Sequence, residues 1–518
     1  GVDIIWLNPI FLSPNDDNGY DISDYREIMR EFGTMEDFDR LLKEIHKREM
    51  RLVLDLVVNH TSDEHPWFEE ARKSRHNSYY NYYHWWPAEK GEPPLRLSYF
   101  DEEGNAWTYN KPTDSYYLHY FSRKQPDLNW ENPEVRQEIF DMMRFWFDKG
   151  IDGFRMDSIS LIAKDPSFPL IDSKKYPDIF SFYAKEPRLH LYLHEMNRQV
   201  LSKYDCMSVG EGSAVMVDDV AKFVDPAREE LNMLYHFDAA RIRNTTLPDN
   251  PESGIDYSLI ALKKMFTEWD KAVDKGWPSI YLGNHDQPRM VSRFGSDKDE
   301  FRALSAKMLI TFLLTMRGTP YWFAGDEIGM RNIRFDHIED YNDIDTINRY
   351  KKAKAEGKDP QAVLDEQKET GRDNARTPFQ WDRSPEAGFT AGTPWLKVNP
   401  DYTWINVADE EKDPTSILNY FKKVVSFRKE NPSLIYGSYH LLDAENPQSY
   451  TFLRKTGADT YLIMLNFSPK AAISTPGIDM SNAHVLLDNY GDRSHMAPQK
   501  DITLRPFEAI VFQLNHPV

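Results

Sequence analysis

Three acidic side chains end apolar, strand-like runs of the sequence. Asp157 ends "IDGFRMD", Glu211 ends "CMSVGE", and Asp286 ends "SIYLGNHD". Carboxyl groups at such positions can act as nucleophile, general acid or general base on a polar, uncharged substrate. The sequence places neither a Cys/His cluster nor a phosphate-binding glycine loop beside them. Acid–base and nucleophilic catalysis is therefore the chemistry that these residues predict.

Cleavage of a glycosidic bond fits this set of groups best. The reaction needs one ionised carboxylate to attack the anomeric carbon and one protonated carboxyl to release the leaving oxygen, through an oxocarbenium-like transition state. Arg155 lies two residues before Asp157, so both side chains are expected on the same face of a strand. We expect Arg155 to hold that aspartate ionised and correctly aimed.

Strand-like runs alternate with helical runs along most of the chain. Thr34 is the expected N-cap of a helix with Asp37 at its third position, and its expected buried residues are Phe38, Leu41, Leu42 and Ile45. A second helix is expected from Pro133 to Gly150, with Val135, Ile139, Met142 and Trp146 buried. The expected strands are 3–10, 51–60, 151–157, 206–211, 231–238, 279–286 and 318–327.

This alternation predicts an α/β fold, a (β/α)8 TIM barrel whose first βα unit lies upstream of Gly1. A doubly wound open sheet is the second possibility. The barrel is favoured because polar residues recur at the C-terminal ends of the strands, where barrel active sites lie. These residues are Asn59, His60, Arg155, Asp157, Glu211, His285 and Asp286.

Two stretches depart from the barrel repeat. Residues 61–132 are too long for an ordinary loop and are expected to form an inserted subdomain after strand 3 of the barrel. Short alternating runs predict a C-terminal antiparallel β-sandwich over 433–518. The barrel would then comprise 1–60 and 133–432, with a charged excursion near 331–395.

Composition limits the partners that the protein can have. A net charge of −20 over 518 residues argues against nucleic acid and anionic membranes, and no apolar run is long enough to span a bilayer. We expect a small neutral oligosaccharide as partner, and a monomer or weak homo-oligomer. Because the chain opens on Gly1 in an apolar run, its natural N-terminus is expected to be missing. The expected location is cytoplasmic, with a periplasmic or secreted protein left open.

Six motifs resemble the α-amylase superfamily, glycoside hydrolase family 13. Four of them match its conserved regions in order, and two are similar to its oligo-1,6-glucosidase, α-glucosidase and sucrose isomerase branch. They are "LDLVVNH" (54–60), "QPDLN" (125–129), "GFRMD" (153–157), "VGE" (209–211), "GNHD" (283–286) and "DNARTPFQWD" (373–382). The resemblance covers essentially the whole chain and implies a TIM-barrel glycosidase.

Carried over by position, the resemblance implies that Asp157 is the nucleophile, Glu211 the general acid/base and Asp286 the transition-state stabiliser. It further implies that His60, Arg155 and His285 hold the first sugar. Asp55 lies inside its strand, so we interpret it as a structural salt-bridge partner.

In exo-acting members, the positions of Asp17, Tyr20 and Arg376 close the first subsite, so the resemblance implies an Asp17–Arg376 ion pair. Phe121 and Gln125 resemble substrate-facing positions of the inserted subdomain. For Phe121, a place in the core of that subdomain is the alternative.

Two departures from the family pattern affect metal binding and linkage preference. The acidic calcium loop of this branch would lie upstream of Gly1 and is not found elsewhere, so no metal or cofactor is assigned. Ser158 follows the expected nucleophile, and Gly212 and Ser213 follow Glu211. The small Ser158 favours α-1,4 or broad linkage preference by its resemblance to α-1,4-cleaving relatives.

Three functions remain open from the sequence. The first is an exo-acting, retaining α-glucosidase that hydrolyses maltose, isomalto-oligosaccharides or sucrose through a covalent glucosyl-enzyme. The second is a sucrose isomerase or transglucosylase, in which a sugar replaces water as the acceptor. The third is a non-catalytic, transporter-associated heavy subunit, which the intact Asp157, Glu211 and Asp286 set disfavours.

Overall fold

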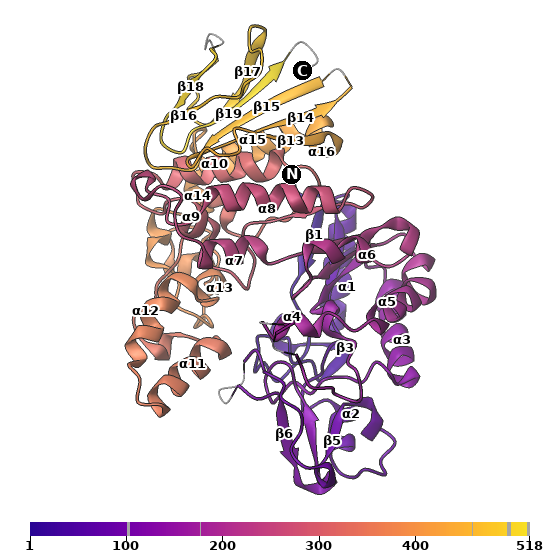
Figure 1. Cartoon of the computed structure of the whole chain (residues 1–518). Coiled ribbons are helices and arrows are strands. Elements are labelled where there is room, and N and C mark those ends of the chain that lie inside the picture. Colours follow the sequence, from indigo (N-terminus) through magenta and orange to yellow (C-terminus); the bar gives the residue numbers. More distant parts are fainter. Residues whose placement is uncertain (101–103, 173, 177, 458, 495–498, 515–518) are drawn as a thin grey trace.

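Parallel strands surrounded by helices form the centre of the molecule (Figure 1). The structure, a computed structural model, describes residues 1–518 except 101–103, 173, 177, 458, 495–498 and 515–518. Among these described residues, no helix is long and apolar enough to cross a bilayer.

The parallel strands follow one another in sequence order. Five hydrogen-bond in the order β1-β4-β8-β9-β10, and β11 pairs with β12. The hydroxyl of Ser279 on β11 joins the two groups by donating to the carbonyl of Leu234 on β10 (2.7 Å). An unbroken sequential order is the order of a TIM barrel, whereas a doubly wound sheet reverses its order at a switch point. The parallel strands are β1 (Ile4–Leu7), β4 (Arg51–Val57), β8 (Gly153–Asp157), β9 (Met207–Glu211), β10 (Met233–Tyr235), β11 (Ser279–Ile280) and β12 (Thr319–Pro320).

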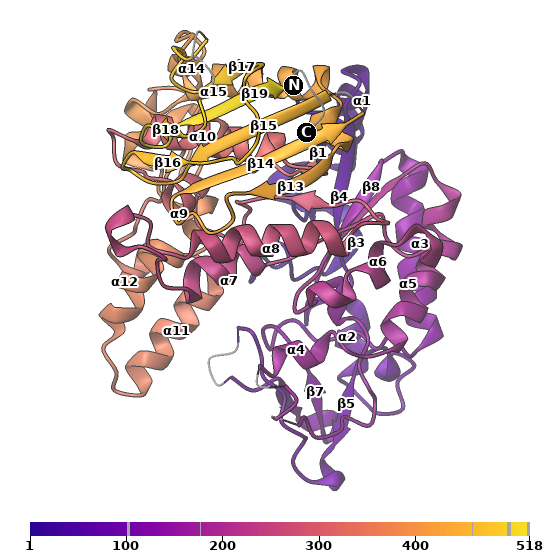
Figure 2. The same ribbon diagram turned by 45° about the horizontal axis from the view of Figure 1, so that its top comes forward.

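All seven predicted strands are confirmed, although β11 and β12 have two residues each and are much shorter than expected. Helices separate them along the chain, and Figure 2 shows α3, α5 and α6 lying outside β4 and β8. The helices between and after the strands are α1 (Met35–Lys47), α3 (Pro133–Lys149), α5 (Arg188–Gln199), α6 (Ala221–Val224), α7 (Asp238–Thr245), α8 (Leu259–Ala272), α9 (Met290–Phe294), α10 (Arg302–Thr315) and α15 (Ile417–Glu430).

The predicted helix signals are confirmed with one exception. Thr34 and Asp37 form a reciprocal capping box on α1, and α3 begins at Pro133 and ends before Gly150 in the left-handed conformation. Leu41 was expected in the core but its side chain is 43% exposed. The buried face of α1 passes through residues 38, 42 and 45, and position 41 lies at its edge.

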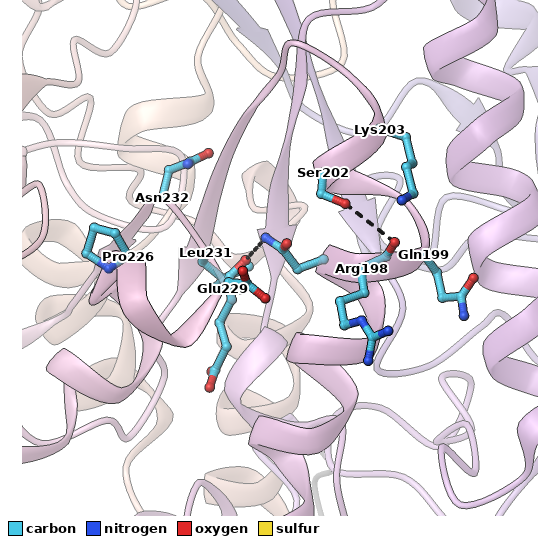
Figure 3. Close-up of a pocket in the computed structure, with 10 residues that line it drawn as sticks. Arg198, Gln199, Ser202, Lys203, Pro226, Glu229, Leu231 and Asn232 are labelled. Atoms are coloured by element: carbon cyan, nitrogen blue, oxygen red, sulfur yellow. Dashed lines mark hydrogen bonds between the residues drawn. The ribbon is translucent and has the colours of Figure 1, made fainter.

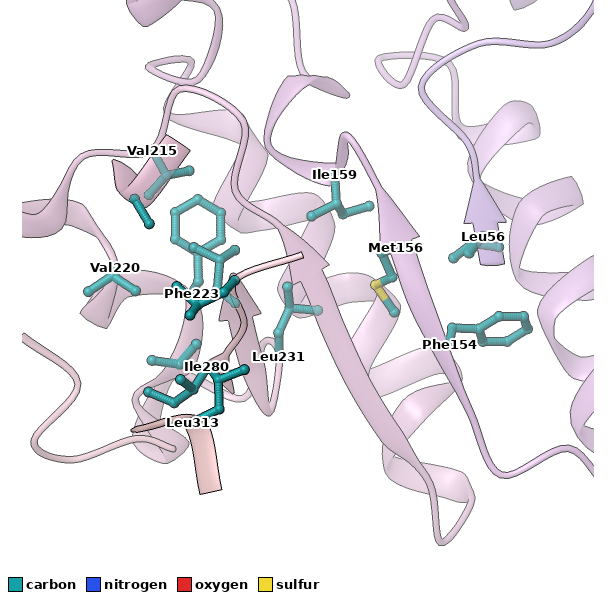
Figure 4. Close-up of a cluster of buried hydrophobic side chains, with 14 of the residues drawn as sticks. Leu56, Phe154, Met156, Ile159, Val215, Val220, Phe223, Leu231, Ile280 and Leu313 are labelled. Atoms are coloured by element: carbon teal, nitrogen blue, oxygen red, sulfur yellow. The ribbon is translucent and has the colours of Figure 1, made fainter. Parts of the chain in front are cut away.

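The apolar core lies between the strands and the surrounding helices (Figure 4). On β8, Phe154 faces outward and its ring packs edge-on against Phe147 of α3, with ring centroids 5.0 Å apart. Because side chains alternate along a strand, Arg155 and Asp157 must face the other way, into the barrel. Their neighbours Phe154 and Met156 therefore supply the burial that holds the strand in place.

Residues 61–132 contain a small antiparallel sheet of their own, in the order β5-β7-β6. Aromatic rings stabilise it: Trp85 stacks on Tyr80 at 4.9 Å between centroids, and Phe68 packs against Tyr117 at 5.0 Å. Its elements are α2 (Pro66–Ala71), β5 (Trp85–Pro87), β6 (Trp107–Asn110) and β7 (Ser115–Leu118), and α4 (Phe180–Tyr183) packs beside it. A hairpin of β2 (Phe11–Leu12) and β3 (Asp24–Ile28) precedes α1.

The charged excursion after β12 is mostly helical. It contains α11 (Ile344–Ala355), α12 (Pro360–Thr370) and the short α13 (Asp373–Arg376), which lie together at one side of the molecule in Figure 1. The charged run "KKAKAEGK" (351–358) is exposed, apart from the buried Ala353. α14 (Val407–Glu410) precedes α15, and α16 (Ser433–Tyr436) leads into the C-terminal domain.

The C-terminal domain is an antiparallel sheet in the order β13-β14-β15-β19-β17, with a separate pair β16-β18. One face of the large sheet packs on α10 through Tyr450 and Phe312, whose ring centroids are 5.3 Å apart. The other face packs against β18 through Leu504. The strands are β13 (Ser438–Leu442), β14 (Ser449–Thr456), β15 (Asp459–Asn466), β16 (Ala472–Ser474), β17 (Ala483–Asp488), β18 (Ile502–Leu504) and β19 (Ala509–Leu514).

A buried arginine joins this domain to the barrel. Arg454 on β14 donates to the carbonyls of Thr315 (2.5 Å), Leu434 (2.6 Å) and Gly437 (2.7 Å). Thr315 is the last residue of α10, so the guanidinium satisfies a helix-end carbonyl that has no partner within the helix. Burial, followed by the charge of Arg428, lowers the pKa of Arg454 to about 9.

We expect Arg454→Met to destabilise the protein, because methionine fills the space but cannot donate to the three carbonyls. Each buried carbonyl left without a donor costs about 1–3 kcal/mol. The apparent melting temperature from circular dichroism should fall clearly below that of the wild type. Lys470→Met, at an exposed position between β15 and β16, is the matched control and should leave it unchanged. Equal melting of both variants would show that these bonds contribute little.

Candidate active site

The candidate site lies at the C-terminal ends of the barrel strands. Asp157 and Glu211 are the last residues of β8 and β9, and His60 follows β4 by three positions. His285 and Asp286 lie in the loop after β11. Hydrogen bonds and ion pairs connect these residues into one network.

Arg155 lies at the centre of this network and is completely buried. Its Nη1 donates to Oδ1 of Asp157 (2.7 Å) and to Oδ1 of Asp55 (2.8 Å). Nη2 donates to Oε2 of Glu211, and Nε donates to the hydroxyl of Tyr235 (3.0 Å). One guanidinium therefore binds three carboxyl groups that come from three neighbouring strands. The expected ion pair of Asp55 is confirmed.

The expectation that Arg155 holds Asp157 ionised is wrong for the free site, because the environment of Asp157 opposes its ionisation. Burial raises the pKa of this carboxyl well above its ordinary value, and the negative charge of Glu211 raises it further, while Arg155 acts in the opposite direction. Burial also raises the pKa of Asp55 against the opposing effect of Arg155. Because burial outweighs the single cation at both positions, Asp55 and Asp157 retain their protons above the usual pH range of an aspartate.

Asp286 has the opposite environment. It accepts bonds from Arg376 Nη2 (3.0 Å) and Arg372 Nη1 (3.3 Å), and its Oδ2 lies 3.1 Å from His285 Nε2. Burial alone would raise the pKa of Asp286, but His285, Arg372 and Arg376 outweigh it and lower this pKa well below its ordinary value. Asp286 therefore stays ionised at lower pH than an ordinary carboxyl group.

The predicted ion pair between Asp17 and Arg376 is wrong. Asp17 Oδ1 lies 3.7 Å from Nη2 of Arg372, and its Oδ2 accepts from Gln125 (3.0 Å). Arg376 instead binds Asp286 and the carbonyl of His285 (2.8 Å). Arg372 is the N-cap of the short helix α13 and Arg376 is its last residue. Both arginines bind Asp286, but only Arg372 comes within ion-pair distance of Asp17. Sequence position alone could not separate two arginines four residues apart.

The other residues predicted from the sequence lie around these arginines and carboxylates. His60 Nε2 lies 3.0 Å from the carbonyl of Tyr20 and 3.2 Å from Nε2 of Gln125, and its ring centroid is 5.1 Å from that of Phe121. Burial lowers the pKa of His60 to about 3, so its imidazole is neutral. The hydroxyl of Tyr20 donates to Asp55 (2.8 Å).

The hydroxyl oxygen of Tyr20 also lies 2.7 Å from Nε2 of His285, and the two rings stack. The structure thus brings together all eleven residues that the sequence singled out: Asp17, Tyr20, His60, Phe121, Gln125, Arg155, Asp157, Glu211, His285, Asp286 and Arg376.

Four residues that contact this set were not expected from the sequence. Tyr235 binds Arg155 and Glu211, and Ser213 donates to Oε1 of Glu211 (2.5 Å). Arg372 and Asp343 lie beside Asp286. Tyr235 is the last residue of β10, so its place at a C-terminal strand end was a signal, but the predicted strand ran on to residue 238 and put Tyr235 in its interior. The signal for Arg372 was available, because it directly precedes the "DNAR" motif.

A separate polar cavity of about 610 Å³ lies far from this network (Figure 3). Ser202 and Lys203 on its wall precede β9, and Leu231 and Asn232 precede β10, so it opens at the N-terminal ends of these strands. Its lining includes none of the residues of the network. In barrels the reactive groups lie at the opposite end, so this cavity is not the candidate active site.

The family model and the curated relatives that match this chain agree with each other. The model of the "Alpha amylase, catalytic domain" family matches residues 1–437. An oligo-1,6-glucosidase of Parageobacillus thermoglucosidasius is 50% identical over 100% of this chain and 92% of its own length. A trehalose-6-phosphate hydrolase of Bacillus subtilis is 41% identical, over 100% of this chain and 91% of its own.

Solved structures agree with the sequence matches. The isomaltulose synthase SmuA from Protaminobacter rubrum is 41% identical, with a TM-score of 0.93 over 100% of this chain and 92% of that one. A variant of the trehalulose synthase MutB is 42% identical, with a TM-score of 0.94 over 99% of this chain and 92% of that one. Both identity and TM-score support the same fold and family along the whole chain.

We expect Arg155→Met to leave buried carboxyls without their cation, which costs about 3–5 kcal/mol of stability near neutral pH. Removal of the cation raises the folded-state pKa values of Asp55 and Asp157 further above their unfolded values. Such groups lose stability as the pH rises from the unfolded pKa through the folded one. The deficit in melting temperature should therefore widen from acid to neutral pH. Arg40→Met, which breaks an exposed pair with Asp37, should show no such trend. A deficit that is independent of pH would contradict the link between stability and the ionisation of these buried carboxyls.

Proposed function

The chain belongs to the α-amylase family of glycoside hydrolases, and from this premise we propose an exo-acting, retaining α-glucosidase that acts on short α-glucosides. One observation carries the proposal: a single buried guanidinium, that of Arg155, binds both Asp157 and Glu211. Retention requires the two reacting carboxyls to lie about 5–5.5 Å apart, whereas inversion needs about 6.5–9.5 Å to admit a water. Two carboxyls bound to one guanidinium fit the shorter separation.

Each carboxyl has a distinct role in the proposed mechanism. Asp157, once it has lost its proton, attacks the anomeric carbon while Glu211 protonates the glycosidic oxygen, which gives a covalent glucosyl-enzyme. Glu211 then removes a proton from water, and the water releases glucose with retained configuration. Asp286 stays ionised because of its low pKa, so its charge favours the oxocarbenium-like transition state throughout.

The proposed pocket is closed behind the first sugar. Arg372 faces Asp17 on one side and the ring of Phe100 on the other, with its guanidinium carbon 4.7 Å from the ring centroid. Asn348 of α11 donates to the carbonyl of Phe100 (2.6 Å), so the excursion and the inserted segment meet there. A chain cannot thread past these contacts, which supports attack at non-reducing ends.

We propose that four parts build this enzyme. Residues 1–60 and 133–432 form the barrel, residues 61–132 form a subdomain that faces the substrate, and the excursion near 331–395 supplies the arginines of α13. Residues 433–518 form the C-terminal domain, which packs on α10 away from the strand ends that carry the carboxyls.

A sucrose isomerase or transglucosylase is the second candidate, favoured by the high similarity to structures of isomaltulose and trehalulose synthases. These activities would use the same three carboxyls and differ in the acceptor. Ser213 is small and polar and binds Glu211 beside the leaving group, so it leaves room for water as acceptor. This contact favours hydrolysis.

Product analysis separates the two candidates. We expect α-glucose as the first product from maltose and isomaltose by proton NMR, because double displacement retains configuration. With sucrose, glucose and fructose should exceed isomeric disaccharides. Amylose should lose single glucose units slowly from its ends. Release of β-glucose would exclude the retaining mechanism, and predominant isomaltulose or trehalulose would favour the isomerase.

A pH profile tests the roles of Asp157 and Glu211. Fluoride leaves without protonation, so Glu211→Gln should still form the glucosyl-enzyme from α-glucosyl fluoride. Because the charge of Glu211 raises the pKa of Asp157, its removal should move the acidic limb of this step to lower pH. Single-turnover rates of wild type and variant across the pH range measure the shift. Asp157→Ala should lose the step almost completely. An acidic limb that does not move would contradict the coupling of the two carboxyls.

A further inference from the structure

Asp343 lies outside the residues assigned above, yet it is completely buried next to them. It is the N-cap of α11, where its Oδ2 accepts from the backbone N–H of Thr346 (2.9 Å) and from the Thr346 hydroxyl (2.7 Å). A capping role alone needs only this one oxygen and no charge, since asparagine and serine cap helices equally well. Capping therefore does not account for the charge of Asp343 or for its second oxygen.

That second oxygen binds the arginines of the active site. Oδ1 of Asp343 accepts from Nε (2.7 Å) and lies 2.5 Å from Nη2 of Arg372, and Nη1 of Arg376 lies 3.7 Å away. Arg372 and Arg376 in turn bind Asp286, and Arg372 faces Asp17. Asp343 thus shares both guanidiniums with the two carboxylates proposed to face the first sugar.

The position of Asp343 is itself restrained. Asp373, at the start of α13, accepts from the backbone N–H groups of Asn342 (2.7 Å) and Asp343 (2.9 Å). The hydroxyl oxygen of Thr346 also lies 2.8 Å from Oε1 of Gln367 of α12. The N-terminus of α11 is therefore bound to both other helices of the excursion, so the carboxyl of Asp343 has little freedom to follow a moving arginine.

We propose that Asp343 is a positioning residue that orients Arg372 and Arg376 toward Asp286 and Asp17, an inference that rests on the proposed α-glucosidase function. Without the charge of Asp343, two cations would face the two remaining carboxylates, and both guanidiniums would be drawn toward the sugar-binding space. With it, Arg372 is held from behind by the hydrogen bond of Nε and the ion-pair contact of Nη2, and it presents its remaining Nη1 to Asp286. The excursion then acts as the support for the closed end of the pocket.

The experiment compares two N-cap substitutions in the same helical excursion. Asp343→Asn keeps the cap of α11 and removes the charge, and Asp359→Asn makes the same change at the exposed N-cap of α12. With p-nitrophenyl α-glucoside, we expect kcat/KM of Asp343→Asn to fall by about 100-fold, the loss expected when a group near the chemistry shifts by about 1 Å. Both KM and kcat should change. Asp359→Asn should match the wild type.

A double-mutant cycle separates positioning from a general loss of structure. In an Arg372→Ala background, Asp343→Asn should cause a much smaller further loss, because the principal partner is already absent. Calorimetric binding of a glucose-like iminosugar should weaken in Asp343→Asn and not in Asp359→Asn. Additive losses in the cycle, or a wild-type kcat/KM for Asp343→Asn, would overturn the proposal.

Two further outcomes are informative. If Asp343→Asn does not fold, Asp343→Ser carries the same test with an equally good cap. Failure of both to fold would show that the charge serves folding, which would overturn the positioning role. An absence of hydrolysis by the wild-type protein would instead reject the proposed function itself, and the inference with it.

Discussion

The contact on which the site depends is the buried guanidinium of Arg155 among three carboxyl groups. Asp55, Asp157 and Glu211 come from β4, β8 and β9, and each would be costly to bury without a cation. Five nitrogen-bound hydrogens in a fixed plane let one arginine bind all three, which lysine could not do. The "GFRMD" motif places this cation inside the barrel where three neighbouring strands end. The apolar Phe154 and Met156 on the other face of the strand supply the burial that keeps it there.

Two opposite electrostatic environments result from this arrangement. Around Arg155 there are more carboxyls than cations, so the pKa of Asp157 is raised and protons are retained. Around Asp286, two arginines and a histidine outnumber the carboxylate, and the pKa of Asp286 is lowered. Groups whose environments separate their pKa values in this way can take different roles within one pocket. Asp157, whose pKa is raised, and Asp286, whose pKa is lowered, thus lie in the same pocket without a change in the type of side chain.

The seven parallel strands could be predicted from the sequence, because each is a continuous or nearly continuous apolar run bounded by helical signals. The same reasoning placed Asp157 and Glu211 correctly, since the C-terminal ends of barrel strands face the active site. It failed for Leu41, which lies at the edge of its helix face, and for the partner of Asp17. It also missed Tyr235, because the predicted strand ran past its true end, and Asp343, because one aspartate among many in a charged stretch does not stand out. These residues matter only through atoms that are distant in sequence.

What the sequence determined by itself was the local order: where strands end, which helices are capped, and which residue types can do chemistry. Strand period and capping depend on neighbours within a few positions, so they can be read along the chain. Only the tertiary structure decided which arginine faces which carboxylate. Arg372 and Arg376 are four residues apart, and both are equally suited to pair with Asp17, Asp286 or Asp343. The choice depends on how α13 is oriented by contacts with the loop after β11, with α11 and with the loop that carries Asp17. These segments are far apart along the chain, and electrostatic pairing follows distance in space rather than distance in sequence.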